Sequence, residues 1–561
     1  MSHYKPGMAD NERVKNEKDA LDVWEDISRY AKLGFKAIAE DDFARMRWYG
    51  IYQQKPNEGH FMLRIKLPGG RLTPMQLREI GMMGNQYARG FGDITTRQDI
   101  QFHWLTIENF PDIFDRIYNK CGLYTDFACG DTPRNICSCP LDGLLVNQVC
   151  QTGDIVQKLS DMFRAGGKEF SNLPRKFKCS VSACPIHCNQ PQINDIGVFG
   201  VIRKADGKDQ RGVGVVVGGG LSNTPHFAQG LRVFVPEEKV QEQLPAIVRQ
   251  LALMFNDSEE RRYKRKYARF KFTVADKGWQ WVRDDLERRL GYPLIHDESI
   301  VDPRGALHTD HMGIGRQSNG LFYVGSPVQR GRMTCDQMIA VADLAERFGE
   351  PGKGQIRLSQ KQNLLLVNIP EGNVAELSGE LEKIDLPPKA PLWRSNLVSC
   401  TGMQFCNLAV VETKDRSLEV LKHLEQEVPG LDSAIMVSVS GCPNSCAQVH
   451  IADIGLTGTK AIWNGKKVDA FDLMLGGCLG AEKAWAKTIV PKIPADLVKQ
   501  VIVQLARNYM ENRVEFTDAD PEPFHAFVAR HDAKELAGYA AIPDWTPPVK
   551  RVRAEPEPET V

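Results

Sequence analysis

The sequence lacks an excess of charge of one sign. Its 71 Lys and Arg residues equal its 71 Asp and Glu residues, so the formal net charge is zero. This balance favours neither nucleic acid nor an anionic membrane as a partner. The sequence also lacks an apolar run near the roughly 20 residues of a spanning helix, and its polar first residues lack the apolar core of a secretory signal. We therefore expect a cytoplasmic protein that binds no nucleic acid and no membrane.

A dinucleotide-binding fingerprint is also missing. No Gly-x-Gly-x-x-Gly segment lies between a strand pattern and a helix pattern, so neither flavin nor nicotinamide binding is indicated. Cysteine, by contrast, is abundant, with 14 residues. Cysteines do not form a disulfide framework in a reducing compartment. Scattered thiols are explained by packing, but clustered thiols indicate metal or redox chemistry.

The chain repeats itself at an offset of about 260 residues. A strand, a helix and a second strand recur in the same order, which is typical of half of a split α+β unit. The first copy has GRLT at 70–73, a helical pattern to Tyr87 and ITTRQDIQFHWLTI at 94–107; the second has GRMT at 331–334, a helical pattern to Phe348 and IRLSQKQNLLLVNI at 356–369.

A second repeat follows each of these units. The segment CPIHCNQPQINDIG at 184–197 matches CPNSCAQVHIADIG at 442–455. Two repeats in the same order at nearly one offset indicate an internal duplication with pseudo-two-fold symmetry. We therefore predict an α+β fold in which two small half-units pair into one domain, because neither alone offers enough sheet to bury. The predicted divisions are an N-terminal arm at 1–44, its first 20 or so residues flexible, half-units at 45–115 and 310–375, larger α/β units at 125–290 and 390–545, and a disordered tail at 546–561.

Four cysteines in the second half form two pairs. Five residues separate Cys400 from Cys406, and three separate Cys442 from Cys446. Four thiolates from two loops can hold a [4Fe–4S] cube, and glycines in both loops suit backbone N–H groups that approach sulfur. Structural zinc is the alternative metal, although the five-residue gap fits zinc less well. Four unrelated core cysteines remain the other alternative.

These paired loops resemble the signature of the siroheme nitrite and sulfite reductases, and the resemblance covers about residues 20 to 540. It implies that the half-units are ferredoxin-like half-domains and that the larger units bind siroheme and a [4Fe–4S] cluster. It further implies that Cys446 bridges the cluster to the siroheme iron. The implied activity is the six-electron reduction of sulfite or nitrite by a monomer, with reduced ferredoxin as the electron donor.

An anionic substrate and a macrocycle with eight carboxylates both require fixed positive charge. Arginine supplies a planar fork for oxyanions, and lysine can deliver protons. The resemblance implies that Arg97, Arg134, Lys176 and Lys178 line the substrate side of the siroheme; solvated surface charge is the alternative for each. Arg97 aligns with Ser359 in the second half. We therefore expect one site at the pseudo-symmetric interface, with substrate groups from one half and cluster ligands from the other.

Two further features of the first half are candidates for cofactor binding. Gly218, Gly219 and Gly220 follow a strand pattern, and three glycines permit close backbone approach to an anion; a flexible turn is the alternative. Cysteines also cluster there, and we weigh a second Fe–S site against packing thiols left by the duplication. That second site would use Cys184, Cys188 and two of the set Cys137, Cys139 and Cys179.

The spacing Lys176-x-Lys178 favours sulfite, because sulfite reductases resembling this chain tend to carry Lys-x-Lys and nitrite reductases Lys-x-Asn. A second ammonium also neutralises a dianion better than a monoanion. Reduction chiefly of nitrite is the alternative. A dissimilatory sulfite reductase subunit and a non-catalytic Fe–S electron carrier are the remaining ones. Arg394 and Lys414 are candidates for a basic patch that docks ferredoxin.

Overall fold

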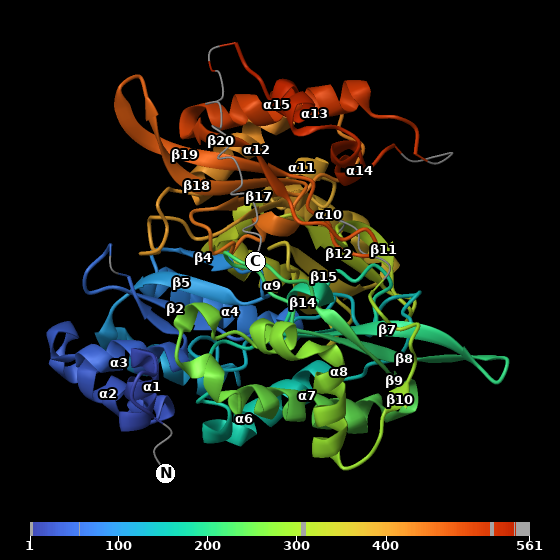
Figure 1. Cartoon of the computed structure of the whole chain (residues 1–561). Coiled ribbons are helices and arrows are strands. Elements are labelled where there is room, and N and C mark those ends of the chain that lie inside the picture. The colour runs from blue at the N-terminus through green and yellow to red at the C-terminus, as the bar shows by residue number, and fades with distance from the viewer. Residues whose placement is uncertain (1–3, 55, 304–309, 517–520, 544, 546–561) are drawn as a thin grey trace, which may run out of the picture.

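The computed structural model describes residues 4–54, 56–303, 310–516, 521–543 and 545. Its described strands form four sheets of five strands each. In Figure 1 one larger sheet (green) lies below and the other (orange) above, with the two half-domain sheets (blue and olive) between them. The predicted tail at 546–561 lies outside the described residues.

The two half-domain sheets exchange one strand each. In sheet order, the first contains β1 (Ile51–Gln53), β2 (Phe61–Ile65), β5 (Ile100–Leu105), β4 (Phe91–Ile94) and β13 (Arg332–Thr334). The second contains β11 (Gly313–Arg316), β12 (Phe322–Ser326), β15 (Leu364–Ile369), β14 (Gln355–Leu358) and β3 (Arg71–Leu72). Strand β13 pairs with β4, with Met333 opposite Gly92, and β3 pairs with β14, with Leu72 opposite Ile356. Each sheet is therefore completed by a strand of the other half.

The exchanged strands lead directly into two helices, α4 (Pro74–Tyr87) and α9 (Cys335–Phe348). Each helix begins with a capping box at Thr73 or Thr334. The threonine side chain accepts a hydrogen bond from the backbone N–H of the glutamine three residues later, and the side chain of that glutamine accepts one from the backbone N–H of the threonine. The two helices end at Tyr87 and Phe348, the residues at which the sequence predicts their ends.

Helices α4 and α9 approach each other closely because α4 carries glycine at the contact. A Cβ atom on Gly81 would lie 2.8 Å from Ile339, and one on Gly84 would overlap the sulfur of Cys335. One hydrophobic core includes buried side chains from both half-units, Phe102 among them. The predicted pairing of the half-units into one domain, within an internally duplicated α+β fold, is confirmed.

Four strands of each larger sheet repeat in the same order, β6 to β9 in the first and β17 to β20 in the second, while the fifth strand lies at opposite edges. The first contains β10 (Ile295–His296), β9 (Gln229–Pro236), β8 (Lys208–Val217), β7 (Ile196–Ala205) and β6 (Cys179–Ser182) in sheet order. The second contains β16 (Leu397–Ser399), β17 (Val437–Ser440), β18 (Ile454–Trp463), β19 (Lys466–Leu475) and β20 (Lys487–Pro494). Strand β6 runs parallel to β7, and β17 runs parallel to β18. The two Cys-x3-Cys loops follow β6 and β17, so the duplication places them after equivalent strands.

Further helices cover these sheets and join the units. They are α1 (Asp10–Glu17), α2 (Trp24–Leu33), α3 (Glu40–Arg45), α5 (Phe110–Phe114), α6 (Ile155–Gly166), α7 (Val240–Asn256), α8 (Phe270–Leu290), α10 (Val374–Lys383), α11 (Leu392–Asn396), α12 (Lys414–Glu427), α13 (Val498–Asn512), α14 (Phe524–Ala529) and α15 (Ala533–Tyr539). Apolar side chains of α7 and α8 belong to the core of the first large sheet, and those of α12 and α13 belong to the core of the second.

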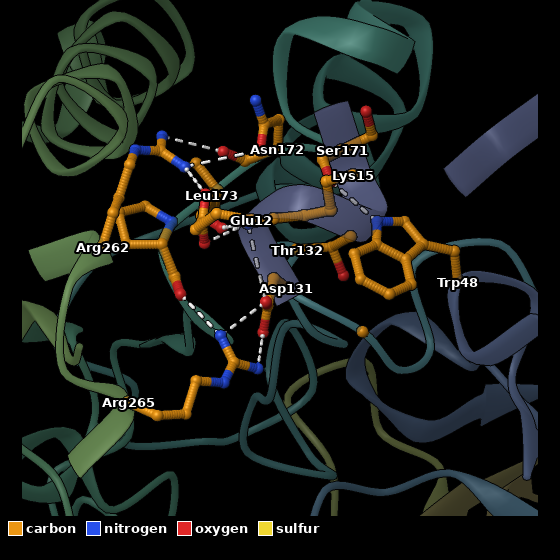
Figure 2. Close-up of polar contacts among 12 residues, drawn as sticks. Glu12, Lys15, Trp48, Asp131, Thr132, Ser171, Asn172, Leu173, Arg262 and Arg265 are labelled. Atoms are coloured by element: carbon orange, nitrogen blue, oxygen red, sulfur yellow. Dashed lines mark hydrogen bonds and ion pairs between the residues drawn. The ribbon is translucent and has the colours of Figure 1, made fainter. Parts of the chain in front are cut away.

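The N-terminal segment is not the flexible arm that its polarity predicts. Helix α1 carries two charged side chains that are almost fully buried, Glu12 and Lys15 (Figure 2). Lys15 Nζ donates to Glu12 at 2.7 Å and to the carbonyl of Leu173 at 2.9 Å. Arg262 donates to Glu12 at 2.7 Å. The prediction of flexibility was wrong because polar residues here satisfy one another inside the protein rather than in water.

The same network reaches Asp131, which lies three residues before Arg134. Arg265 donates to both carboxylate oxygens of Asp131 at 2.7 Å, and Lys15 lies 3.6 Å away (Figure 2). Burial opposes ionisation of Asp131, but the charges of Arg265 and Lys15 outweigh it and hold the pKa of the carboxyl well below its usual range. Helix α1 therefore helps to fix the loop that carries Arg134.

Replacing Glu12 tests this role of α1. Glu12→Gln removes the ion-pair partner of the buried Arg262 and leaves Lys15 with Asp131 at 3.6 Å, and breaking a buried ion pair typically costs about 3–5 kcal/mol. We expect a clear fall in the thermal midpoint measured by differential scanning fluorimetry. Asp10→Asn is the matched control, because Asp10 lies on the same helix with a side chain 76% exposed; an equal fall in both variants would contradict this role.

Candidate active site

An open pocket lies at the interface of the two halves. From the first half it is lined by the turn 96–97 between β4 and β5, by Lys176 and Lys178 and by parts of 190–194. From the second half it is lined by Gln360 and by parts of the loop 444–448 that follows β17. The pocket thus lies where the duplication led us to expect a site.

Arg97 lines this pocket and is held by three acceptors. Its Nη1 donates to Asn194 Oδ1 at 2.9 Å, and its Nη2 donates to the carbonyls of Asn135 and, at 3.0 Å, Cys179. None of these three acceptors is charged, so they hold the guanidinium without pairing it to a carboxylate. Ser359 in the second half provides no equivalent cation, in agreement with the predicted asymmetry.

Lys176 and Lys178 both line the pocket, as the period-two spacing predicts, while Phe177 between them is fully buried in the core. Burial, with the nearby charge of Arg269, lowers the pKa of Lys176 to about 7. Burial, with the charges of Lys176 and Arg97, lowers the pKa of Lys178 well below its usual value. The pocket therefore holds more positive charge than it neutralises, and an anion bound there would relieve the repulsion.

Arg134 does not line the pocket but lies next to it. Its Nη1 donates to the carbonyl of Ala128 at 2.9 Å, and its Nη2 donates to that of Gly130 at 2.7 Å. Its charge helps to lower the pKa of Lys176, after burial and Arg269. Of the four predicted cations, the structure thus brings three into the lining and places Arg134 behind them.

Two further arginines belong to the same group of cations and were missed from the sequence. Arg269 lines the pocket, donates to Asp195 at 2.8 Å and is followed two residues later by Lys271. Lys271 lies within helix α8 and outside the pocket lining, so the strand spacing that marked the lysine pair could not have found Arg269. Arg64 on β2 donates to Cys129 Sγ at 3.2 Å. Burial opposes its charge, but Cys129, Asp99 and, less strongly, Cys446 raise the pKa of Arg64. No motif marked Arg64 in the sequence.

These arginines keep unused hydrogen-bond donors. Among the described residues, the Nε atoms of Arg64, Arg97, Arg134 and Arg269 are buried without a hydrogen-bond partner. Buried donors without partners are costly, and carboxylates are the acceptors that guanidinium groups bind best. The residues present therefore fit an anionic macrocycle such as siroheme.

The glycine segment contributes in a different way from the one predicted. A Cβ atom on Gly218 would lie 2.7 Å from Val274, and one on Gly219 would lie 2.5 Å from the carbonyl of Gln192. These glycines are required by packing against the chain itself. Gly220 lies near Arg269, where a Cβ atom would be 3.1 Å from the guanidinium. The pocket lining itself begins at the next two residues, Leu221 and Ser222.

The two halves also contact each other through the residues that follow the Cys-x3-Cys loops. Gln190 and Gln448 occupy the same place in the two copies of the repeat, and their side-chain amides bond reciprocally, at 2.9 Å and 2.5 Å. Both line the pocket. Their shared position in the repeat was visible in the sequence, although nothing in their side-chain chemistry marked them as site residues.

The cluster cysteines Cys400, Cys406, Cys442 and Cys446 lie on the loops after β16 and β17. The N–H of Gly441 donates to Cys400 Sγ at 3.2 Å, as expected for a loop that directs donors at sulfur. Burial raises the pKa of the first three thiols, and the charge of Cys446 raises it further. The Cys446 sulfur therefore lies within electrostatic range of the other three.

Cys446 is the exposed member of the four and the one that lines the pocket. Its carbonyl accepts a hydrogen bond from Thr96 Oγ1 at 3.2 Å, so it adjoins the turn of Arg97. A thiolate at this place can contact both the cluster side and the pocket side, which fits the bridging role implied by the resemblance.

The two residues predicted for the ferredoxin-docking patch, Arg394 and Lys414, are not available for docking. Arg394 is paired with Glu425 at 2.9 Å and with Asp385 at 3.2 Å. Lys414 is fully buried and donates to the carbonyl of Arg330. Charges that are paired or buried offer little attraction to a partner, so neither residue can act as a free docking cation.

The first-half cysteines divide into two groups. Cys139, Cys184 and Cys188 lie together with His311, within 4.8 Å of one another at their ligand atoms. Cys137 and Cys179 are buried elsewhere, next to Arg97. The sequence hypothesis of two further cysteines beside Cys184 and Cys188 is therefore corrected: one cysteine and one histidine join them.

Comparison with known families agrees with this site. The family described as nitrite and sulphite reductase 4Fe-4S domain matches residues 129–294 and 394–522. The nitrite/sulfite reductase ferredoxin-like half domain matches residues 52–120 and 314–384. This chain belongs to the nitrite and sulphite reductase 4Fe-4S family. The predicted family, the enzyme class of oxidoreductase, and the cofactors siroheme and a [4Fe–4S] cluster are thereby confirmed.

Nitrite reductases and sulfite reductases are both similar to this chain over most of its length. The assimilatory ferredoxin-dependent nitrite reductase of Haloferax mediterranei is 35% identical and covers 88% of this chain and 87% of its own. The sulfite reductase [ferredoxin] of Mycobacterium tuberculosis is 34% identical, covering 96% and 97%. The solved structure of the Mycobacterium tuberculosis NirA protein has a TM-score of 0.86 at 33% identity, covering 94% and 97%. Among the described residues, no helix is long and apolar enough to cross a membrane.

Replacing one cluster cysteine tests the ligand set. Cys406→Ser is expected to lower the iron content from about five atoms per chain, one cluster plus siroheme, to about one or fewer. Cys150→Ser is the control, because the Cys150 Sγ donates to the carbonyl of Gly212 at 3.2 Å and a hydroxyl can replace it there. Full iron content in Cys406→Ser, measured by plasma mass spectrometry, would remove Cys406 from the ligand set.

Proposed function

We propose that this chain is a ferredoxin-dependent reductase that reduces sulfite to sulfide and nitrite to ammonia by six electrons, with sulfite preferred. The observation that carries the proposal is a pocket of buried, under-neutralised cations that reaches Cys446. A small oxyanion is the ligand that such a site favours, and the adjoining cysteines can hold an electron store beside it.

The cofactors are assigned to separate parts of the site. Cys400, Cys406, Cys442 and Cys446 would hold the [4Fe–4S] cluster, and the cationic pocket would hold siroheme through its carboxylates. When bound, these groups would supply electrons and a redox-active iron. The protein supplies the positive charge, the orientation and the protons.

Each predicted cation has a separate task in this proposal. Arg97 is fixed by Asn194 and two carbonyls, so it can orient an oxyanion without moving. Lys176 has a pKa lowered to about 7, chiefly by burial, so its ammonium can release a proton near neutral pH. Lys178 adds charge beside it when an anion is bound, because the anion offsets the burial and the neighbouring cations that lower the pKa of Lys178. Arg134 supports both from beside the lining.

The preference for sulfite rests on the second lysine of the pair. Two ammonium groups favour a dianion over a monoanion, because the attraction scales with the product of the charges. The names of the relatives include both substrates: nitrite for Haloferax mediterranei and sulfite for Mycobacterium tuberculosis. Reduction chiefly of nitrite is therefore the alternative.

The donor is proposed to dock over the loop that carries Cys406. Met403 and Leu408 on this loop are 42% and 60% exposed. The guanidinium of the exposed Arg89 lies 3.7 Å from the ring centroid of Trp104, whose ring lies 5.3 Å from that of Phe405. A small acidic ferredoxin can meet both apolar contact and free positive charge here, close to a cluster ligand. Arg89 thus replaces the cations first predicted for this patch.

For oligomeric state and localisation, we propose a monomer in the cytoplasm that binds neither nucleic acid nor membrane. An electron carrier would not need the buried cations around Arg97, so a non-catalytic role is disfavoured. Native mass distinguishes a monomer from a subunit of a dissimilatory complex. We expect a mass equal to one chain of 62.9 kDa plus cofactors.

Substrate turnover tests the reaction and the preference together. We expect the purified holoprotein to reduce both anions with reduced ferredoxin, with a higher kcat/KM for sulfite. Lys178→Asn should lower kcat/KM for sulfite about tenfold more than that for nitrite, which corresponds to about 1.4 kcal/mol of lost attraction. Lack of turnover with both anions would refute the function, and equal losses would refute only the preference.

Charge reversal at Arg89 tests the docking surface. Arg89→Glu should raise KM for ferredoxin about tenfold at low salt, with less effect at high salt because screening weakens the repulsion. Turnover with reduced methyl viologen should stay unchanged. Lys204→Glu is the control, since Lys204 is 80% exposed on the β7–β8 hairpin. An unchanged KM for ferredoxin in Arg89→Glu would contradict docking at this loop.

A further inference from the structure

Four potential metal ligands converge outside the active site, from three segments of the chain. Cys184 and Cys188 lie on the loop after β6, Cys139 lies in the segment between α5 and α6, and His311 lies just before β11. Their ligand atoms all lie within 4.8 Å of one another. This convergence brings together residues more than a hundred positions apart, so it does not follow from local loop geometry.

The distances match a single tetrahedral metal ion. For zinc, bonds of about 2.3 Å to sulfur and about 2.0–2.1 Å to nitrogen place sulfurs about 3.8 Å apart and sulfur about 3.5 Å from nitrogen. Cys184 Sγ and Cys188 Sγ are 3.9 Å apart. His311 Nε2 lies 3.2 Å from Cys139 Sγ and 3.7 Å from each of the other two sulfurs.

A disulfide and an iron–sulfur cube both fit these distances less well. A disulfide between Cys184 and Cys188 would need about 2.0 Å between the sulfurs, and the observed separation is 3.9 Å. A [4Fe–4S] cube places several iron and sulfide atoms between its thiolates, so its ligands stand further apart than those of a single ion. In the described structure the cluster cysteines Cys400, Cys442 and Cys446 do not approach one another as closely as this group does.

The site is enclosed by apolar side chains. Cys139 and Cys184 are fully buried in a small core with Leu141, Leu365 and Val367. With three sulfurs and one nitrogen from the protein, the tetrahedral shell is complete and leaves no position for a substrate. Closed sites of this kind are structural, whereas catalytic zinc keeps an open position.

The duplication accounts for the position of this site opposite the cluster. Ser138-Cys139 corresponds to Ser399-Cys400 at the offset of the first repeat, and Cys184 and Cys188 correspond to Cys442 and Cys446 at that of the second. Three of the four cluster ligands therefore have counterparts here. Leu145 stands where the fourth, Cys406, would be, and His311 supplies the missing ligand from another segment.

We propose that Cys139, Cys184, Cys188 and His311 bind one structural Zn²⁺ ion at the pseudo-symmetric counterpart of the iron–sulfur site. The ion ties the segment before β11, which begins the second half of the chain, to the loop of the first half. That loop leads to Gln190, whose side chain bonds to Gln448 across the pocket. The ion therefore fixes the wall of the pocket without entering the reaction, and it does not depend on which anion is reduced.

Metal analysis of the purified holoprotein tests the proposal. We expect about one zinc per chain in addition to about five irons. Zinc K-edge absorption, which siroheme does not obscure, should show three sulfurs at about 2.3 Å and one nitrogen at about 2.0–2.1 Å. About nine irons without zinc would indicate a second cluster, and about five irons without zinc would indicate packing thiols; either result overturns the proposal.

Variants locate the ion. Cys188→Ser and His311→Ala should lose zinc while iron stays near five per chain, and Cys150→Ser, outside the site, should keep both metals. His311→Cys should retain zinc, because four thiolates also bind it tetrahedrally. If the first two variants do not fold, zinc released from the unmodified holoprotein by a mercurial reagent provides the same count. Zinc retained in both folded variants would place it elsewhere and refute the assignment.

Discussion

Positive charges buried close together repel one another, and this pocket contains at least Arg97, Lys176, Lys178 and Arg269 within one lining. Such a group persists only if rigid structure holds each member and an anion completes it. Neutral carbonyl and amide oxygens hold Arg97, so its charge is not consumed by a carboxylate. The protein thus orients Arg97 with dipoles, pairs Arg269 with Asp195 at 2.8 Å, and leaves the remaining counter-charge to be supplied by what it binds.

Further carboxylates neutralise buried cations outside the pocket. Asp131 accepts two hydrogen bonds from Arg265, and Glu12 compensates Lys15 and Arg262. These ion pairs fix the loop of Arg134 and the first helix without entering the pocket. The cations of the pocket can therefore bind an anion, while the ion pairs outside it hold the loop and the helix in place.

The duplication provides two similar scaffolds, and substitutions have given them different chemistry. Arg97 in one copy corresponds to Ser359 in the other, so only one turn carries the cation. The loop of Cys446 serves the electron store, while the loop of Cys188 belongs to the tight group with His311. A pseudo-symmetric fold can therefore hold an asymmetric site, because each half keeps its backbone while its side chains diverge.

Much of the fold was predictable because the repeat is explicit in the sequence. The helices after Thr73 and Thr334 follow from caps and periodicity, and the lysine pair at 176 and 178 follows from strand spacing. The buried network of Glu12 could not be predicted, since polarity suggests solvent when the partners are distant in sequence. The same holds for His311, which reaches its sulfurs only through the tertiary fold, and Lys414 was misjudged because burial of a lysine leaves no local signal.

The exchange of β3 and β13 has a consequence for synthesis of the chain. Strand β4 ends at Ile94, but its neighbour β13 begins only at Arg332, about 240 residues later. At about 5–20 residues per second, ribosomes need roughly 10–50 s to cover that distance. During this interval the edge of the first sheet is open and can pair with the wrong strand. Correct assembly of the nascent chain therefore depends on timing, since both sheets close only when the second half emerges.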